Sequence, residues 1–187
     1  MGRWEPGARG RLEQAALALY SERGFEQTTV AEIAKRAGLT ERTFFRHFAD
    51  KREVLFAGSA VLQERMVAAV AEAPDSAAPI AAVAAGLEAA ATLLQRRDFA
   101  RRRQAIIAGN PELQERELIK LASLASAIAE ELRRRGVNEP AASLAAEAGI
   151  AVFRVAFERW IEAANQQELS ELIRDSLAEL NAVTAGT

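Results

Sequence analysis

The chain has 187 residues, half of them apolar, which is enough to form the core of one large domain or of two smaller ones. It contains no cysteine and one histidine, His47, which excludes disulfide bonds, thiol catalysis and zinc sites built from cysteines or several histidines. The net charge is −2, but residues 1–60 have ten Lys or Arg against eight Asp or Glu, whereas residues 61–187 have fourteen against eighteen. A weakly basic amino-terminal part on an acidic body permits DNA binding at one end.

The sequence carries no sign of export or of membrane insertion. No apolar segment follows the first residues, MGRWEP, as a secretory signal requires. The alanine-rich run 77–94 contains Glu88, which makes it a poor membrane span. We therefore expect a soluble, cytoplasmic protein without a membrane partner. Because its residue types leave little chemistry beyond carboxylates, we also expect no enzyme activity, no cofactor and no metal site.

Alanine, leucine, glutamate and arginine dominate the composition and β-branched and aromatic residues are sparse, which favours an all-α fold. Glycine, proline and capping residues divide the chain into about nine helices after an amino-terminal arm, residues 1–8. The predicted helices are 9–23, 29–38, 40–48, 51–73, 79–97, 98–108, 111–136, 139–164 and 167–183.

The second and third predicted helices are short and joined by a turn around Gly38, which is the pattern of a helix-turn-helix. Thr29 and Glu32 have the spacing of a capping box at the start of the first of these helices. Thr40 is a suitable N-cap for the second.

Within 40–48, Phe44 and Phe48 are four residues apart and share the face that we expect in the core. The opposite face carries Glu41, Arg42, Phe45 and Arg46. Such a helix can lie in the major groove of DNA, where base edges present distinct donor and acceptor patterns.

A run of residues between about 9 and 56 combines core, capping, turn and phosphate-facing positions in one order. Its members are Gly24-Phe25, Thr28-Thr29-Val30, Ile33-Ala34, Ala37-Gly38-Leu39-Thr40, Thr43-Phe44-Phe45-Arg46-His47-Phe48 and Lys51. This run resembles the DNA-binding domain of the TetR family. The resemblance implies a helix-turn-helix DNA-binding domain in residues 1–50, with its arm, and a helical ligand-binding and dimerisation domain in residues 51–187.

The resemblance also assigns DNA contacts to positions of this sequence. Thr29 would hold a phosphate from the start of its helix, and His47 and Lys51 match positions near the DNA backbone. The positions that would read bases or adjoining phosphates are Thr40, Glu41, Arg42 and Thr43.

Phe45 departs from the family, which usually has a tyrosine that bonds a phosphate at this position. Without a hydroxyl, Phe45 would contact a sugar or a thymine methyl, or serve only in packing. Arg46 is expected to supply the charge instead. We expect Arg42 to read a guanine, because a guanidinium can bond O6 and N7 together, and Glu41 to accept from a cytosine amine or to repel wrong placements.

The last two predicted helices have amphipathic patterns that suit a four-helix interface between two copies of the chain. The predicted homodimer contacts are Leu144, Ala148, Val152, Leu169, Leu172, Ile173 and Leu177. The alternative is burial of these residues inside one subunit. A dimer is expected because two helix-turn-helix heads about 34–36 Å apart match a palindromic operator.

An aromatic and aliphatic stripe on the sixth and eighth predicted helices suggests an apolar pocket for a small-molecule effector. Its predicted lining is Phe99, Arg103, Ile106, Phe153, Phe157 and Trp160. The alternative is that the stripe is ordinary core.

Together these predictions describe a sequence-specific transcriptional regulator, a repressor that a small molecule releases from a palindromic operator. The ligand would act by shifting the predicted helix 51–73, which runs from the DNA-binding head into the body. Two other classes remain open: an enzyme, which turnover would reveal, and a protein-interaction module, in which Arg42→Ala and Lys51→Ala would leave DNA binding unchanged.

Overall fold

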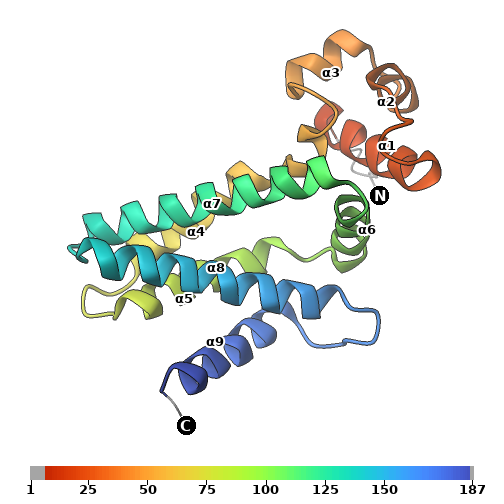
Figure 1. Cartoon of the computed structure of the whole chain (residues 1–187). Helices are drawn as coiled ribbons and strands as arrows, with labels where there is room; N and C mark the ends of the chain where they lie inside the picture. The colour runs from red at the N-terminus through yellow and green to blue at the C-terminus, as the bar shows by residue number, and fades with distance from the viewer. Residues whose placement is uncertain (1–6, 186–187) are drawn as a thin grey trace, which may run out of the picture. The chain divides into compact units, whose positions relative to one another are not determined.

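The computed structural model describes residues 7–185, and within that range it contains nine α-helices, one 3-10 helix and no strand (Figure 1). This confirms the all-α prediction. Most of the predicted arm, residues 1–6, lies outside the described range. The elements are α1 (Ala8–Arg23), α2 (Val30–Arg36), α3 (Glu41–His47), η1 (Glu53–Phe56), α4 (Ser59–Glu72), α5 (Pro79–Leu93), α6 (Arg97–Ala108), α7 (Pro111–Arg134), α8 (Glu139–Ile161) and α9 (Leu169–Ala185).

The chain divides into two compact units, which we call the head and the body. The head is the chain up to Gly58 together with 102–117, and the body is 59–101 together with the chain from Leu118 onward. This division differs from the predicted boundary at residue 50. The reason is that η1 packs against α1 and buries Val54, Leu55 and Phe56, so the head does not end with α3.

The head forms because each of its short helices is capped locally and buries one apolar face against α1. Thr29 and Glu32 make both hydrogen bonds of the predicted capping box at α2. Gly38 adopts the positive φ of +67° that the turn between α2 and α3 requires. Ile33 and Phe44 are completely buried, which fixes α2 and α3 on the head's core.

The prediction of one continuous helix over 51–73 is wrong. The Asp50 carboxylate accepts hydrogen bonds from the amides of Arg52 and Glu53, and this cap opens only the 3-10 turn η1. The chain then turns at Ala57 and Gly58, and α4 begins at Ser59. The apolar side chains of η1 are buried in the head, whereas α4 belongs to the body, so the chain passes from one unit to the other between these two elements.

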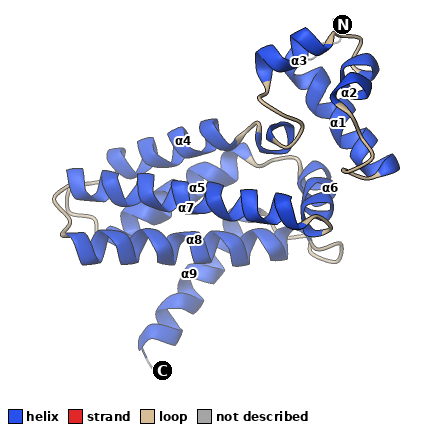
Figure 2. Ribbon diagram, turned by 45° about the horizontal axis from the view of Figure 1, so that its top comes forward, coloured by secondary structure: helices blue, strands red, loops and turns tan. Residues whose placement is uncertain are grey.

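The body is a helical bundle in which α5 packs against α4, α8 and α9 (Figure 2). Its core includes buried side chains such as Met66 of α4, Leu87 of α5 and Ile128 of α7. Helices α5 and α8 approach closely at Gly149, where an added Cβ would lie 2.3 Å from Cγ1 of Val83. A side chain at position 149 would therefore force Val83 or the helices themselves to shift.

Two stretches, Glu53–Glu72 and Glu139–Ile161, are long and apolar enough to cross a membrane by length and composition alone. The second is α8, which buries Ile150, Phe153 and Trp160 in the body's core. A core helix of a bundle has the same length and composition, so this feature of α8 is explained by its packing.

Candidate nucleic-acid interface

Helix α3 separates its side chains into a buried face and an exposed face, as the sequence predicted. Phe44 is fully buried and Phe48 is 5% exposed, whereas Phe45 is 56% exposed. Arg42 and Arg46 are exposed beside Phe45. The rings of Phe44 and Phe45 pack edge to face with their centroids 5.4 Å apart, so the exposed ring of Phe45 contacts the buried ring of Phe44.

The exposed cations of α3 differ from Arg23 and Arg36, two other surface arginines of the head. Arg36 makes two hydrogen bonds to Glu22, and Arg23 bonds Glu32 at 2.8 Å, so these arginines already have carboxylate partners. Among the described residues, Arg42 and Arg46 have no such partner. Their guanidinium groups therefore remain available for phosphate or base edges.

The threonines predicted to contact DNA also cap the two helices. Thr40 Oγ1 accepts from the Thr43 amide at 3.2 Å and lies 3.0 Å from the Thr43 hydroxyl. Thr29 Oγ1 accepts from the Glu32 amide at 3.2 Å. The Glu32 carboxylate in turn accepts from the amide and hydroxyl of Thr29, and these hydrogen bonds hold its pKa below the usual value. The sites that would face phosphate are thus preorganised by capping.

Lys51, which was predicted to lie near the DNA backbone, is bonded to backbone carbonyls within the head. Its Nζ donates to the carbonyls of Phe25, Glu26 and Thr28 at 2.9, 3.3 and 3.1 Å. It also lies 4.4 Å from the centroid of the Phe25 ring. An ammonium group has three donors, and all three are used here. Lys51 therefore fixes the connection between α1 and α2.

His47, at the end of α3, is half-buried. Its Nε2 is enclosed and has no hydrogen-bond partner in the part of the chain that the structure describes. The ring packs beside Phe48 with centroids 6.4 Å apart. A phosphate contact by His47, as the resemblance suggests, would need the ring to turn or to present its other nitrogen.

Arg103 and Ile106 were predicted to line an effector pocket, and the structure corrects this: both belong to the head. Arg103 Nε donates to the Leu55 carbonyl at 2.6 Å, and its Nη1 bonds Glu117 at 3.2 Å. The guanidinium stacks over Phe56, and its burial lowers the pKa of Arg103. A second ion pair joins Arg116 to Glu53 at 2.6 Å. Nothing in the sequence pattern indicated these partners.

The other residues of the predicted pocket pack as ordinary core or near it. Phe153 and Trp160 are 7% and 2% exposed, and Phe157 lies between them with ring centroids 5.9 and 5.8 Å away. Phe99 is half-buried under the guanidinium of Arg96. The aromatic stripe thus matches the alternative stated above, and a cavity of about 340 Å³ lies elsewhere in the body, between α4 and α7.

The predicted dimer contacts divide into buried and exposed sets. Val152, Leu169, Leu172 and Ile173 are at most 4% exposed within one protomer, which leaves them no surface for a second copy and corrects that part of the prediction. Leu177 packs partly against the same core, Ala148 is half-buried, and Leu144 is 71% exposed. Two further apolar residues near them are exposed, Val155 of α8 and Val183 of α9, and of these Val183 has no place in the predicted interface.

Comparison with known proteins identifies both halves of the chain. Residues 13–57 match the model of bacterial regulatory proteins of the tetR family, and residues 77–185 match the model of the MftR C-terminal domain. Over 81 residues the chain is 37% identical to the HTH-type transcriptional regulator TcmR of Streptomyces glaucescens. The matched segment is 43% of this chain and 36% of TcmR. Over 47 residues the chain is 43% identical to the HTH-type transcriptional repressor KstR2 of Mycobacterium tuberculosis. This second matched segment is 25% of this chain and 24% of KstR2.

The likeness in fold extends over almost the whole chain. The SmeT–triclosan complex superposes with a TM-score of 0.64 at 19% identity, covering 93% of this chain and 91% of that one. SmeT is the repressor of a multidrug efflux pump of Stenotrophomonas maltophilia. The fold, the helix-turn-helix geometry and the two family matches agree. The chain belongs to the TetR family of bacterial regulatory proteins, a family of transcriptional regulators rather than of enzymes.

Proposed function

We propose that the protein is a cytoplasmic, homodimeric transcriptional repressor without a membrane partner, which binds a palindromic operator and is released from it by a small molecule. The observation that carries the DNA-binding part is the exposed face of α3, where Arg42, Phe45 and Arg46 stand clear of a fully buried Phe44. A short capped helix with unpaired arginines on its outer face has the form of a recognition helix for the major groove.

The proposed base and phosphate contacts follow from this face. Arg42 would read a guanine, and Arg46 would bond a phosphate beside it. Phe45 would contact a sugar or a thymine methyl. Thr29 and Thr40 are exposed residues at the starts of α2 and α3, which supports phosphate contacts from the helix starts.

An exposed stripe on α8 supports the proposed dimer. Leu144, Ala148, Ala151 and Val155 follow one another at steps of three or four residues, so they share one face of the helix. Beside this stripe, Val155 of α8 and Leu180 and Val183 of α9 line a shared groove. An apolar face of two helices, repeated in a second copy about a two-fold axis, is the usual construction of a four-helix interface.

The dimer is tested by placing a charge in the stripe. Val155→Arg should convert the protein to a monomer at micromolar concentration, as sedimentation velocity would measure, because an arginine cannot be buried unpaired between two copies. Ala122→Arg on the exposed face of α7 is the matched control and should remain dimeric. A dimer that tolerates Val155→Arg would place the interface elsewhere.

The repressor itself is tested by selecting bound sequences from a random DNA pool with the full chain at physiological salt. We expect enrichment of an inverted repeat whose half-sites are about one DNA turn apart. A variant with Arg42→Ala and Arg46→Ala should lose this enrichment, whereas Arg65→Ala, on the exposed surface of α4, removes a charge of the same kind and should keep it. No enrichment from the folded wild type would contradict the proposal.

The helix break at Gly58 changes the expected route of ligand release. One rigid helix from head to body is not present, because η1 and α4 are separate elements. The proposal therefore needs only that the ligand binds more tightly to a conformation of the dimer that fits the operator poorly. Complexes such as that of SmeT with triclosan are examples of the family fold with a small molecule bound.

A further inference from the structure

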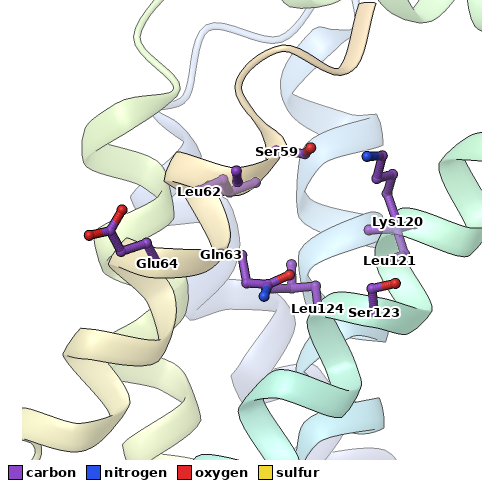
Figure 3. A pocket seen from close by; sticks show the side chains of 9 residues that line it. Ser59, Leu62, Gln63, Glu64, Lys120, Leu121, Ser123 and Leu124 are labelled. Atoms are coloured by element: carbon purple, nitrogen blue, oxygen red, sulfur yellow. The ribbon is translucent and has the colours of Figure 1, made fainter. Parts of the chain in front are cut away.

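A partly open cavity of about 340 Å³ lies between helices α4 and α7 of the body and involves neither the recognition helix nor the proposed dimer stripe (Figure 3). Its apolar lining includes Leu62 of α4 and Leu121 and Leu124 of α7. Leu124 is 5% exposed and continues into the body's core. Small-molecule pockets are mainly apolar and begin at about 300 Å³, so this cavity has the size for a small ligand.

Two polar side chains that line this cavity have no hydrogen-bond partner among the described residues. Ser59 and Gln63 are four residues apart on α4 and therefore share a face, and Figure 3 shows the Gln63 amide directed toward Leu124 of α7. Both residues are half-buried, and within residues 7–185 no protein group hydrogen-bonds to either side chain. Polar groups that are partly removed from water favour a ligand that supplies the missing bonds.

A third polar group is limited to accepting. The Ser123 hydroxyl donates to the Ile119 carbonyl at 2.9 Å, so its oxygen can offer only lone pairs to the cavity. The cavity thus offers a ligand an amide donor, a serine hydroxyl and an acceptor oxygen, together with apolar contacts to leucine side chains.

The charges around the cavity argue against an ionic ligand. Glu64 is exposed, and in Figure 3 its carboxylate points away from α7. Lys120 already has an interaction partner. Neither charge is therefore placed to compensate the cost of taking a charged ligand out of water.

We propose that the effector of this regulator is an uncharged molecule with an apolar body and at least one hydrogen-bonding oxygen, and that it binds in the cavity between α4 and α7 through Gln63 and Ser59. This inference rests on the regulatory function proposed above. The place suits regulation, because Ser59 follows directly after Gly58, where the head ends, and α7 passes from the head to the body just before Leu118. A ligand held here contacts the first turns of two chain segments that leave the head.

The probe for the test is 6-propionyl-2-(dimethylamino)naphthalene, an uncharged dye with one carbonyl acceptor whose emission moves to the blue on leaving water. We expect the full-length wild type to bind it. Ala60→Trp should lower this affinity at least tenfold, because Ala60 lines the cavity and an indole at this exposed position would occupy the space of the ligand. Ala68→Trp, an exposed position on the same helix outside the cavity, is the matched control and should bind the dye like the wild type.

Gln63→Leu keeps the size of the side chain and removes the amide. This variant should bind the dye about two- to tenfold more weakly, which corresponds to the loss of one neutral hydrogen bond. The emission of the bound dye should also shift further to the blue, because its carbonyl loses the hydrogen-bond donor. An unchanged spectrum and affinity in this variant would overturn the role of Gln63. Equal affinity of the wild type and Ala60→Trp would overturn the location, and no binding by the wild type would overturn the ligand class.

Reciprocity of linkage tests the effector role. Operator DNA recovered by selection should change the dye's affinity by the same factor by which the dye changes the affinity for operator. Dye affinity that is identical with and without operator would overturn the assignment of this cavity as the effector site. Failure of the repressor proposal would be seen separately, as the lack of any selected operator. Ala60→Trp should bind the operator like the wild type when no dye is present.

Discussion

Replacing Lys51 by methionine removes the ammonium group and keeps most of the apolar stem. In the structure this ammonium donates to three carbonyls, of Phe25, Glu26 and Thr28, and lies over the Phe25 ring. If the side chain works as this clamp, the variant should lose stability in the head. If it instead neutralises a phosphate, the variant should lose affinity for all DNA sequences alike.

The size of the stability loss follows from these contacts. A hydrogen bond from a charged donor contributes about 1.5–3 kcal/mol, but the three bonds share one half-buried ammonium and water can replace part of them in the variant. The contact with the ring of Phe25 adds about 0.5–1 kcal/mol. We expect Lys51→Met to lower the free energy of unfolding by about 2–3 kcal/mol, measured by urea denaturation.

The salt dependence of operator binding separates the two roles. Each phosphate contact contributes about 0.9 to the slope of log K against log salt concentration. At a temperature where all variants are folded, Lys51→Met should keep the wild-type slope, and Arg46→Met should lower it by about 0.9. A Lys51→Met variant that unfolds like the wild type but has the reduced slope would refute the clamp.

Three further outcomes are expected. Arg42→Ala should cost about 1–3 kcal/mol of discrimination at one base pair of each half-site, visible as a relaxed position in the selected sequences; unchanged specificity would remove Arg42 from base reading. Gly149→Ala should destabilise the body by about 1–3 kcal/mol because its Cβ meets Val83, and it should cost less in a Val83→Ala background; additive effects in this cycle would contradict the close crossing. The hydrogen bond from Arg52 holds the pKa of Asp50 below its ordinary value of 3.8, so its stabilisation is complete above that value and is lost as the pH falls below about 4. Urea unfolding at pH 6 and pH 3 should therefore show a smaller acid loss for Asp50→Asn than for the wild type, and an equal loss would show that another group is responsible.

The head could be predicted almost element by element, because its signals act over three or four residues. The capping box at Thr29, the N-cap at Thr40 and the turn at Gly38 are local chemistry, and the structure has all three. The burial of Phe44 and the exposure of Phe45 follow from helical periodicity alone. The same local signals failed only where a cap opened a 3-10 turn in place of an α-helix, since the cap does not state which kind of helix follows it.

Side-chain partners across the head could not be read in this way. Lys51 matches a position near DNA in the resemblance, yet its three acceptors are carbonyls more than twenty residues earlier in the chain. Arg103 was predicted to line a pocket, yet it bonds the carbonyl of Leu55, 48 residues away. Only the folded chain brings these groups within hydrogen-bond distance.

In the body, periodicity marked the helices but left open which of their apolar faces turn inward. Helix α8 has small or apolar residues around much of its circumference, so Val152 and Val155 are equivalent in the sequence pattern. The close crossing of α5 at Gly149 decides between them, because it sets the rotation of α8 that buries Val152 and exposes Val155. Local hydrogen bonding and helical periodicity are encoded residue by residue, whereas the rotation of a mostly apolar helix, the stripe it leaves exposed and the cavity between α4 and α7 depend on the shapes of neighbouring helices that meet only on folding.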